Sequence, residues 1–84
     1  MEYEILIKPS AEKSMNRLPR RIRSRIVAAL EGLREDPRPR GVVKLGGADD
    51  FWRIRVGSYR VVYEIDDDQL TVLILRVAHR KHAY

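Results

Sequence analysis

Most of the fold follows from one stretch, Trp52-Arg53-Ile54-Arg55-Val56-Gly57-Ser58-Tyr59-Arg60-Val61-Val62-Tyr63. Apolar and charged residues alternate on both sides of Gly57-Ser58, which is the pattern of two β-strands. Gly57-Ser58 predicts a two-residue hairpin turn, because glycine supplies the positive φ that such turns require. With that turn, Arg55 lies directly opposite Arg60 on the neighbouring strand.

The same register divides the hairpin into two faces, because cross-strand neighbours share a face. One face is aromatic and aliphatic and is expected to pack on the core: Trp52, Ile54, Val56, Tyr59, Val61 and Tyr63. The other face carries Arg53, Arg55 and Arg60. Like charges placed directly opposite each other are destabilising, so an anion bound among these arginines would explain them.

The residues before the hairpin predict one strand and two helices. Period-two alternation indicates a strand over Glu2–Lys8, which Pro9 ends. Ser10 is the expected N-cap of a short helix that stops near Leu18-Pro19. Pro19 suits the first turn of a second helix, and Asp36-Pro37 ends that pattern. The expected buried positions are Ala11, Met15 and Leu18 on the first helix and Ile22, Ile26, Ala29, Leu30 and Leu33 on the second.

Further strands are expected over Val42–Leu45, Phe51–Val56, Tyr59–Ile65 and Leu70–Val77, with a turn at Asp66–Gln69. The order β-α-α-β-β-β-β predicts an α+β fold in which a helical hairpin packs on a mostly antiparallel sheet.

Composition limits the class of protein. The 84 residues suit one domain spanning 1–84. The net charge of +5 favours a polyanionic partner. The sequence has no cysteine and two histidines, so thiolate sites are excluded and a metal site would need carboxylate ligands. We expect no metal and no cofactor. The apolar runs are too short for a membrane span, and we expect a cytoplasmic protein without a membrane partner.

Each basic cluster also has an ordinary explanation. Strand arginines protect sheet surfaces from aggregation, and Asp49, Asp50 or Glu64 could neutralise the three on the hairpin. A second basic group is either a solvated face or a general surface for binding nucleic acid or the ribosome. Its members are Arg17, Arg20, Arg21, Arg23 and Arg25. The tail from Arg76 to Tyr84 places imidazole, guanidinium, ammonium and phenol groups together, although a frayed basic terminus is the simpler explanation.

These motifs together resemble a known family. Lys44-Leu45-Gly46, the block from Trp52 to Ile65, Val77-Ala78-His79-Arg80 and Tyr84 are similar to the RelE/ParE toxin superfamily, and most similar to RelE-type mRNA interferases. The resemblance covers nearly the whole chain and implies the RelE-like toxin fold.

The resemblance also implies an activity. RelE-like toxins are endoribonucleases that cleave mRNA in the A site of the 70S ribosome, where the 2′-hydroxyl attacks the adjacent phosphorus. By motif, the catalytic positions fall on Arg53, Arg55, Arg60, Arg80 and Tyr84. Lys44 matches an RNA-facing position, and Lys81 and His82 are expected to assist RNA binding. The family requires no metal.

One departure concerns the general base. Some family members carry lysines on the second strand of the sheet, whereas Arg53 and Arg55 stay protonated and are poor bases. His79, His82, Tyr84 or a ribosomal group must then serve. We take His79 as a hypothesis, because its unperturbed pKa suits proton transfer and it adjoins Arg80.

Partners and rival functions follow from the resemblance as well. A cognate antitoxin is expected to inhibit the toxin, and the complex would bind operator DNA through the antitoxin. A non-enzymatic ParE-like inhibitor of DNA gyrase and a degenerate binding protein are the alternatives. The tail with His79, Arg80 and Tyr84 favours the ribonuclease.

Overall fold

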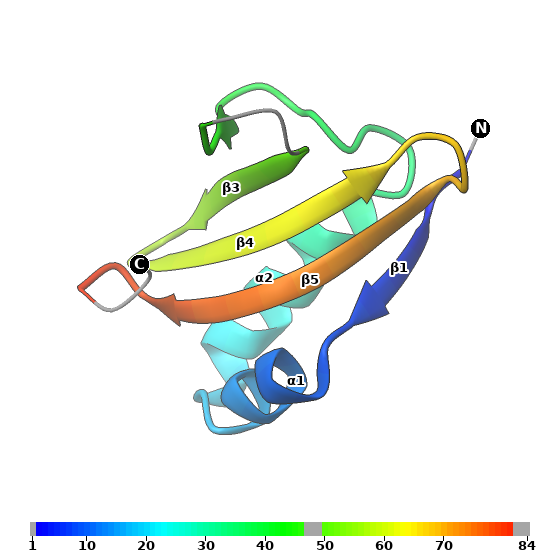
Figure 1. Cartoon of the computed structure of the whole chain (residues 1–84). Helices are drawn as coiled ribbons and strands as arrows, with labels where there is room; N and C mark the ends of the chain where they lie inside the picture. Colours follow the sequence, from blue (N-terminus) through cyan, green and yellow to red (C-terminus); the bar gives the residue numbers. More distant parts are fainter. Residues whose placement is uncertain (1, 47–49, 82–84) are drawn as a thin grey trace.

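The computed structural model describes residues 2–46 and 50–81. Its elements follow the predicted order (Figure 1): β1 (Glu4–Ile7), α1 (Pro9–Asn16), α2 (Arg20–Gly32), β2 (Val43–Lys44), β3 (Phe51–Val56), β4 (Tyr59–Asp66) and β5 (Thr71–His79). The α+β prediction is confirmed.

The strands form a five-stranded sheet in the order β1-β5-β4-β3-β2. The pairs β2–β3, β3–β4 and β4–β5 are antiparallel, whereas β1 pairs with β5 in parallel. A parallel neighbour needs a crossover connection. The connection from β1 contains the helical hairpin, and it places the first and last strands of the chain side by side at one edge of the sheet.

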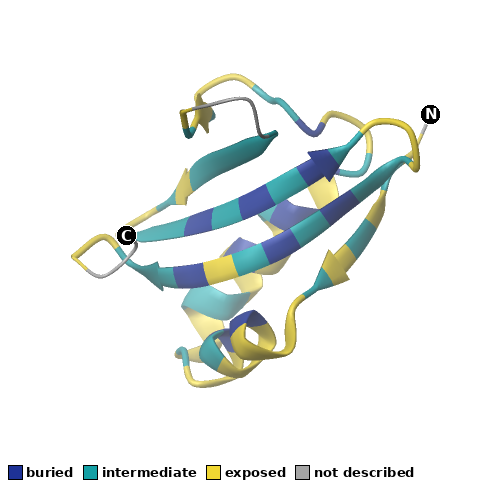
Figure 2. Ribbon diagram, viewed as in Figure 1, coloured by how far each residue is buried: buried dark blue, intermediate teal, exposed yellow. Residues whose placement is uncertain are grey.

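The helices cover one face of the sheet. In Figure 1, α2 crosses behind β4 and β5, and α1 lies beside the edge of β5 below the end of β1. One buried cluster joins the two layers: Ala11, Met15, Ile26, Leu30, Leu33, Val61, Tyr63, Ile65, Val72, Ile74 and Val77. Figure 2 shows buried residues alternating with less buried ones along β4 and β5. The strands therefore turn every second side chain toward the helices.

The β3–β4 hairpin has the predicted register. Val56 pairs with Tyr59, and Arg55 pairs with Arg60. Gly57 occupies the turn with a φ of 60°, a conformation that costs other residues free energy. The core face is confirmed by Val61 and Tyr63, which are fully buried.

A β-bulge changes the alternation within β5. Val62 pairs with Arg76 and Tyr63 pairs with Ile74, so Leu75 is an extra residue. Such an insertion moves the residues after it to the opposite face relative to simple alternation. Before the bulge, Val72 and Ile74 are buried; after it, Val77 is buried and Arg76 is exposed.

Several expected boundaries shift. Helix α1 begins at Pro9 with Lys8 at the N-cap and no side-chain cap, so the expected Ser10 cap is wrong. Proline's fixed φ suits the first helical position and starts the helix earlier than expected. Leu70 belongs to a turn because its φ is 54°. At the other end β5 continues to His79, because Ala78 and His79 pair with β4.

Among the residues that the structure describes, no helix is both long enough and apolar enough to cross a membrane.

Candidate functional site

Four arginines lie together on the sheet face opposite the helices. Arg55 pairs with Arg60, while Arg53 and Arg76 flank Val62 from β3 and β5. Cross-strand partners share a face, and these positions alternate with the buried Val61, Tyr63 and Val77. We call Arg53, Arg55, Arg60 and Arg76 the arginine face. Arg55 and Arg76 are exposed, and the other two are half-buried.

Arg76 was not predicted as a site residue. It reaches this face because of the bulge at Leu75. Alternation continued from Val72 and Ile74 would direct Arg76 toward the core, where an arginine is rarely found. That conflict was a signal in the sequence that could have revealed the bulge.

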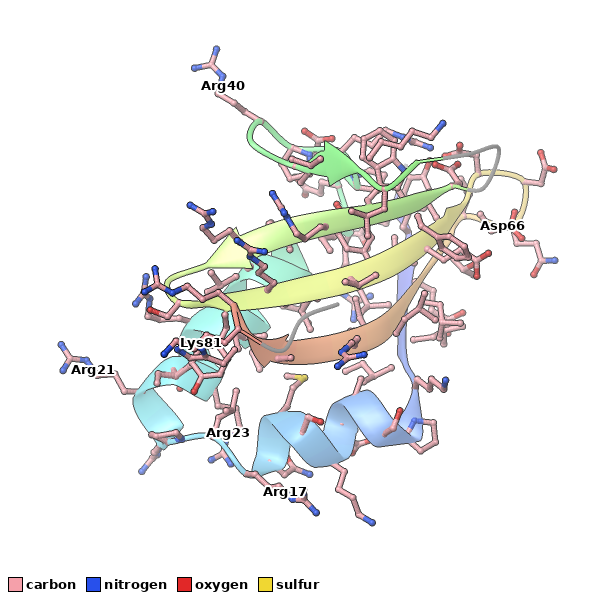
Figure 3. All side chains as sticks on the ribbon, turned by 60° about the vertical axis from the view of Figure 1, so that its left-hand side comes forward. Arg17, Arg21, Arg23, Arg40, Asp66 and Lys81 are labelled. Carbon is pink, nitrogen blue, oxygen red and sulfur yellow. The ribbon has the colours of Figure 1, made fainter. Side chains whose placement is uncertain are left out.

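Arg80 lies next to the hairpin turn. Its backbone N–H donates to the carbonyl oxygen of Ser58 at 2.8 Å, which anchors the segment after β5 beside the β3–β4 turn. The Arg80 side chain is exposed, and so is Lys81. Figure 3 places Lys81 at this end of the sheet, with Asp66 at the far end. This hydrogen bond holds the backbone of Arg80 close to the strand ends that carry Arg55 and Arg60.

His79 lies on the other side of β5. It pairs with Tyr59, and the two rings meet edge to face with centroids 5.4 Å apart. Tyr59 packs against the core, so the register directs His79 to the helix-facing side. Its Nδ1 accepts a hydrogen bond from the N–H of Lys81 at 3.4 Å. The structure does not bring the His79 side chain together with Arg55 and Arg60.

Lys44 also lies apart from the arginine face. It pairs with Trp52, and its Nζ is 5.9 Å from the centroid of a Trp52 ring. Trp52 packs against the core. The predicted residues His82 and Tyr84 lie outside the described residues.

At the opposite end of the sheet, one arginine is held by carboxylates. Arg38 donates to Asp50 at 2.8 Å and to both carboxylate oxygens of Asp67, at 3.2 and 2.9 Å. The Trp52 indole N–H donates to Asp50 and the Tyr3 hydroxyl donates to Asp67. The Arg38 guanidinium carbon is also 5.2 Å from a Trp52 ring centroid. We call these five residues the Arg38 cluster.

The Arg38 cluster was not anticipated, and it changes one expectation. Asp50 was a candidate to neutralise the hairpin arginines, but its carboxylate binds Arg38 and Trp52. Hydrogen bonding to Arg38, and then to Tyr3, lowers the pKa of Asp67. The same bond to Asp67 raises the pKa of Tyr3. These contacts therefore favour the charged carboxylate of Asp67 and the neutral hydroxyl of Tyr3.

A buried tyrosine ties the loop after α2 to the sheet. The hydroxyl of Tyr63 donates to the carbonyl oxygen of Pro37 at 2.8 Å, and Pro37 is itself buried. Desolvation by burial raises the pKa of Tyr63, so it stays neutral and acts as a donor.

The helix arginines form a separate basic surface. Arg17, Arg20, Arg21 and Arg25 are exposed, and Arg23 is half-buried. In Figure 3, the labelled Arg17, Arg21 and Arg23 project from the helical side of the molecule. Within residues 2–46 and 50–81, no group of three or more His, Cys, Asp or Glu residues could hold a metal ion. The arginine face presents guanidinium groups, which suit phosphate recognition.

Two helices packed on one face of a five-stranded, mostly antiparallel sheet match the fold of RelE toxins. The family model described as "ParE toxin of type II toxin-antitoxin system, parDE" matches residues 5–84. The chain is similar to the toxin RelG of Mycobacterium tuberculosis, with 34% identity over 100% of this chain and 98% of the relative. It is also similar to toxin RelE of the same organism, with 32% identity over 98% of this chain and 86% of the relative.

Solved structures agree. The archaeal RelE–RelB complex from Pyrococcus horikoshii matches with a TM-score of 0.87 and 32% identity, over 99% of this chain and 100% of that chain. A mutant of the Escherichia coli toxin RelE in the free state matches with a TM-score of 0.83 and 28% identity, over 96% of this chain and 86% of that chain. The chain belongs to the RelE/ParE family of toxins of type II toxin–antitoxin systems.

Proposed function

We propose that the chain is a ribosome-dependent endoribonuclease that cleaves mRNA in the ribosomal A site and so inhibits translation, which requires a cytoplasmic location. The observation that carries the proposal is the arginine face. Arg55 lies directly opposite Arg60, an arrangement that costs free energy in the free protein. A bound phosphodiester would remove that repulsion.

The reaction needs no group beyond RNA and proton-transfer partners. The 2′-oxygen bonds to the adjacent phosphorus, its proton passes to a base, and the bond from phosphorus to the 5′-oxygen breaks. The products are a 2′,3′-cyclic phosphate and a 5′-hydroxyl, which gains a proton. Negative charge grows on the non-bridging oxygens, and fixed guanidinium groups stabilise it.

The roles of individual residues follow from this chemistry. Arg60 and Arg80 are proposed to bind the non-bridging oxygens, with Arg53 and Arg55 supporting the phosphate charge. Tyr84 is proposed to stack on a base, as aromatic faces do with single-stranded RNA. Lys44, Lys81 and His82 are proposed to contact RNA outside the cleaved linkage.

The sequence offers His79, His82, Tyr84 or a ribosomal group as the general base, and we propose that it is one of the last three. The packing of His79 against Tyr59, on the helix-facing side, argues against His79. We therefore expect His79→Ala to retain single-turnover cleavage within about threefold of wild type, well short of the 10²–10⁴-fold contribution of general acid–base catalysis. A loss of about 100-fold or more would restore His79 as the base.

The proposal is tested by primer extension on mRNA incubated with the toxin, with and without ribosomes programmed with that mRNA. We expect cleavage in the A-site codon only when ribosomes are present. Intact mRNA under both conditions would overturn the proposal.

A cognate antitoxin is the proposed partner. Several structurally similar toxins are described as complexes with RelB antitoxin. The toxin–antitoxin complex is further proposed to bind operator DNA through the antitoxin.

Inhibition of DNA gyrase is the second candidate, because the matching family model is described by ParE. A supercoiling assay separates the two functions. Gyrase inhibition accompanied by intact mRNA on ribosomes would favour the ParE-like activity.

A further inference from the structure

A cavity lies beside the arginine face, between α1 and β5. Its volume is about 390 Å³. The polar lining comes from Lys8, Ser10, Ser14 and Arg76, and the apolar lining includes Leu75 and Ala78. Arg76 is thus shared between the cavity and the arginine face.

The topology explains why this space is open. Strand β1 ends at Ile7, and its pairing with β5 stops at Ile74. The N–H of Lys8 donates to the carbonyl oxygen of Ile74 at 2.9 Å, and the chain then enters α1. The part of β5 after Ile74 therefore has α1 beside it instead of a strand. The bulge at Leu75 directs Arg76 outward at this point.

The lining suits a phosphate group. Lys8 and Arg76 supply positive charge, and the hydroxyl of Ser10 can donate a hydrogen bond. The hydroxyl of Ser14 donates to the carbonyl oxygen of Ser10 at 3.1 Å. The side chains left to donate to a phosphate are therefore those of Lys8, Ser10 and Arg76. Charged donors bind phosphate oxygens with short, strong hydrogen bonds. The apolar side chains of Leu75 and Ala78 can contact a sugar or base.

The cavity also lies next to the proposed cleavage site. Ala78 pairs directly with Arg60, and paired residues of antiparallel strands lie about 4.5–5.5 Å apart. An RNA strand with its scissile phosphate at Arg60 needs to cross only β5 to reach the cavity.

The opposite direction is unfavourable for RNA. A second cavity, of about 450 Å³, lies at the far end of the sheet and is lined by Glu64, Asp66, Asp67 and Asp68 among others. Carboxylates repel phosphate, so the charge distribution directs an RNA strand toward α1.

We propose that the cavity between α1 and β5 binds the phosphate of a nucleotide next to the cleaved linkage, with Lys8 and Arg76 as its cationic ligands. This inference rests on the proposed function, because RNA is the polymer assumed to lie on the arginine face. The site therefore extends RNA binding beyond the catalytic arginines.

The test measures binding of a single-stranded RNA hexanucleotide that is 2′-O-methylated throughout and so cannot be cleaved. The variant is K8Q/R76Q, and the matched control is K13Q/R40Q, which makes the same change of charge at exposed positions. Figure 3 shows Arg40 pointing away from the sheet. We expect K8Q/R76Q to weaken binding about tenfold more than the control and to reduce the salt slope by about 0.7, since the variant loses one phosphate contact and each such contact on a single strand contributes about 0.7.

A second measurement keeps the result independent of folding. Inorganic phosphate titrated into wild-type protein should shift the NMR amide signals of Ser10 and Ser14, and these shifts should disappear in K8Q/R76Q. Equal weakening of RNA binding in the two double variants would overturn the proposal. Phosphate shifts without any difference in RNA binding would also overturn it, because the cavity would then take free phosphate only.

The inference and the proposed function can fail separately. If the methylated RNA binds through the cavity but mRNA stays intact on ribosomes, the inference stands and the proposed function falls. If ribosomal mRNA is cleaved but the two double variants bind RNA equally, the inference alone falls.

Discussion

Arginine side chains have opposite kinds of neighbour at the two ends of the sheet. Arg38 lies between the carboxylates of Asp50 and Asp67, with its guanidinium against Trp52. On the arginine face, Arg55 instead has Arg60 directly across from it. The Arg38 cluster pairs opposite charges, whereas the arginine face places four guanidinium groups on one side of the sheet.

We expect the Arg38 cluster to serve the stability of the fold and the arginine face to serve RNA cleavage. Substitutions in the Arg38 cluster should alter stability and leave RNA cleavage unchanged. Substitutions on the arginine face should do the reverse. Each prediction below tests one side of that separation.

The largest effect is expected on the arginine face. Arg60→Gln removes a proposed ligand of the phosphate charge, and we expect a loss of about 10²–10³-fold in single-turnover cleavage, as for other groups that stabilise oxyanions. The melting temperature should not fall by more than a few degrees, roughly the effect of 1 kcal/mol or less, since Arg60 is only half-buried and lies outside the buried core. A large fall in the melting temperature with normal cleavage would contradict the assignment of the arginine face to cleavage.

The next effect concerns Tyr63. Tyr63→Phe removes the buried hydrogen bond to Pro37 and leaves a carbonyl oxygen without this donor. We expect the free energy of unfolding to fall by about 1–2 kcal/mol. In a domain of this size, each kcal/mol lowers the melting temperature by roughly 4–8 °C. Calorimetry measures the shift, and ribosomal cleavage at 25 °C should be unchanged because Tyr63 faces the helices.

A smaller effect is expected at Arg38. Arg38→Gln breaks contacts that are partly exposed, with 34% of the Arg38 side chain accessible, so we expect destabilisation of about 1 kcal/mol or less. The fluorescence of Trp52, the single tryptophan, should change because the guanidinium leaves its ring. Unaltered fluorescence would contradict the cluster's geometry.

The smallest effect is a pH dependence. The pKa of Asp67 is lowered in the folded state, so its stabilising contribution is present above the unfolded pKa of about 3.9 and is lost as pH falls through the folded value. Asp67→Asn removes this titration. The melting temperature should therefore fall less between pH 5 and lower pH in Asp67→Asn than in wild type, and identical pH profiles would exclude the linkage.

The sequence predicted the hairpin well because local rules determine it. A two-residue turn at Gly57-Ser58 permits one register, and that register places Arg53, Arg55 and Arg60 on one face. The period of the helices likewise revealed Ile26, Leu30 and Leu33 as core residues, all of which are buried.

The remainder depended on contacts that local patterns do not contain. The bulge at Leu75 arises from pairing between β4 and β5 and determines where Arg76 and His79 point. The Arg38 cluster joins residues up to 64 positions apart in the sequence. The position of Lys44 could not be predicted without the β2–β3 register, because that pairing places it opposite Trp52.

The central claim is tested most directly by single-turnover cleavage of mRNA on programmed ribosomes, with wild type, Arg60→Gln and Arg38→Gln compared side by side and the 3′ ends of the products analysed. We predict 2′,3′-cyclic phosphate ends from wild type, a rate about 10²–10³-fold lower for Arg60→Gln, and an unchanged rate for Arg38→Gln. Equal rates for wild type and Arg60→Gln, or products that end in a 3′-hydroxyl, would contradict the account.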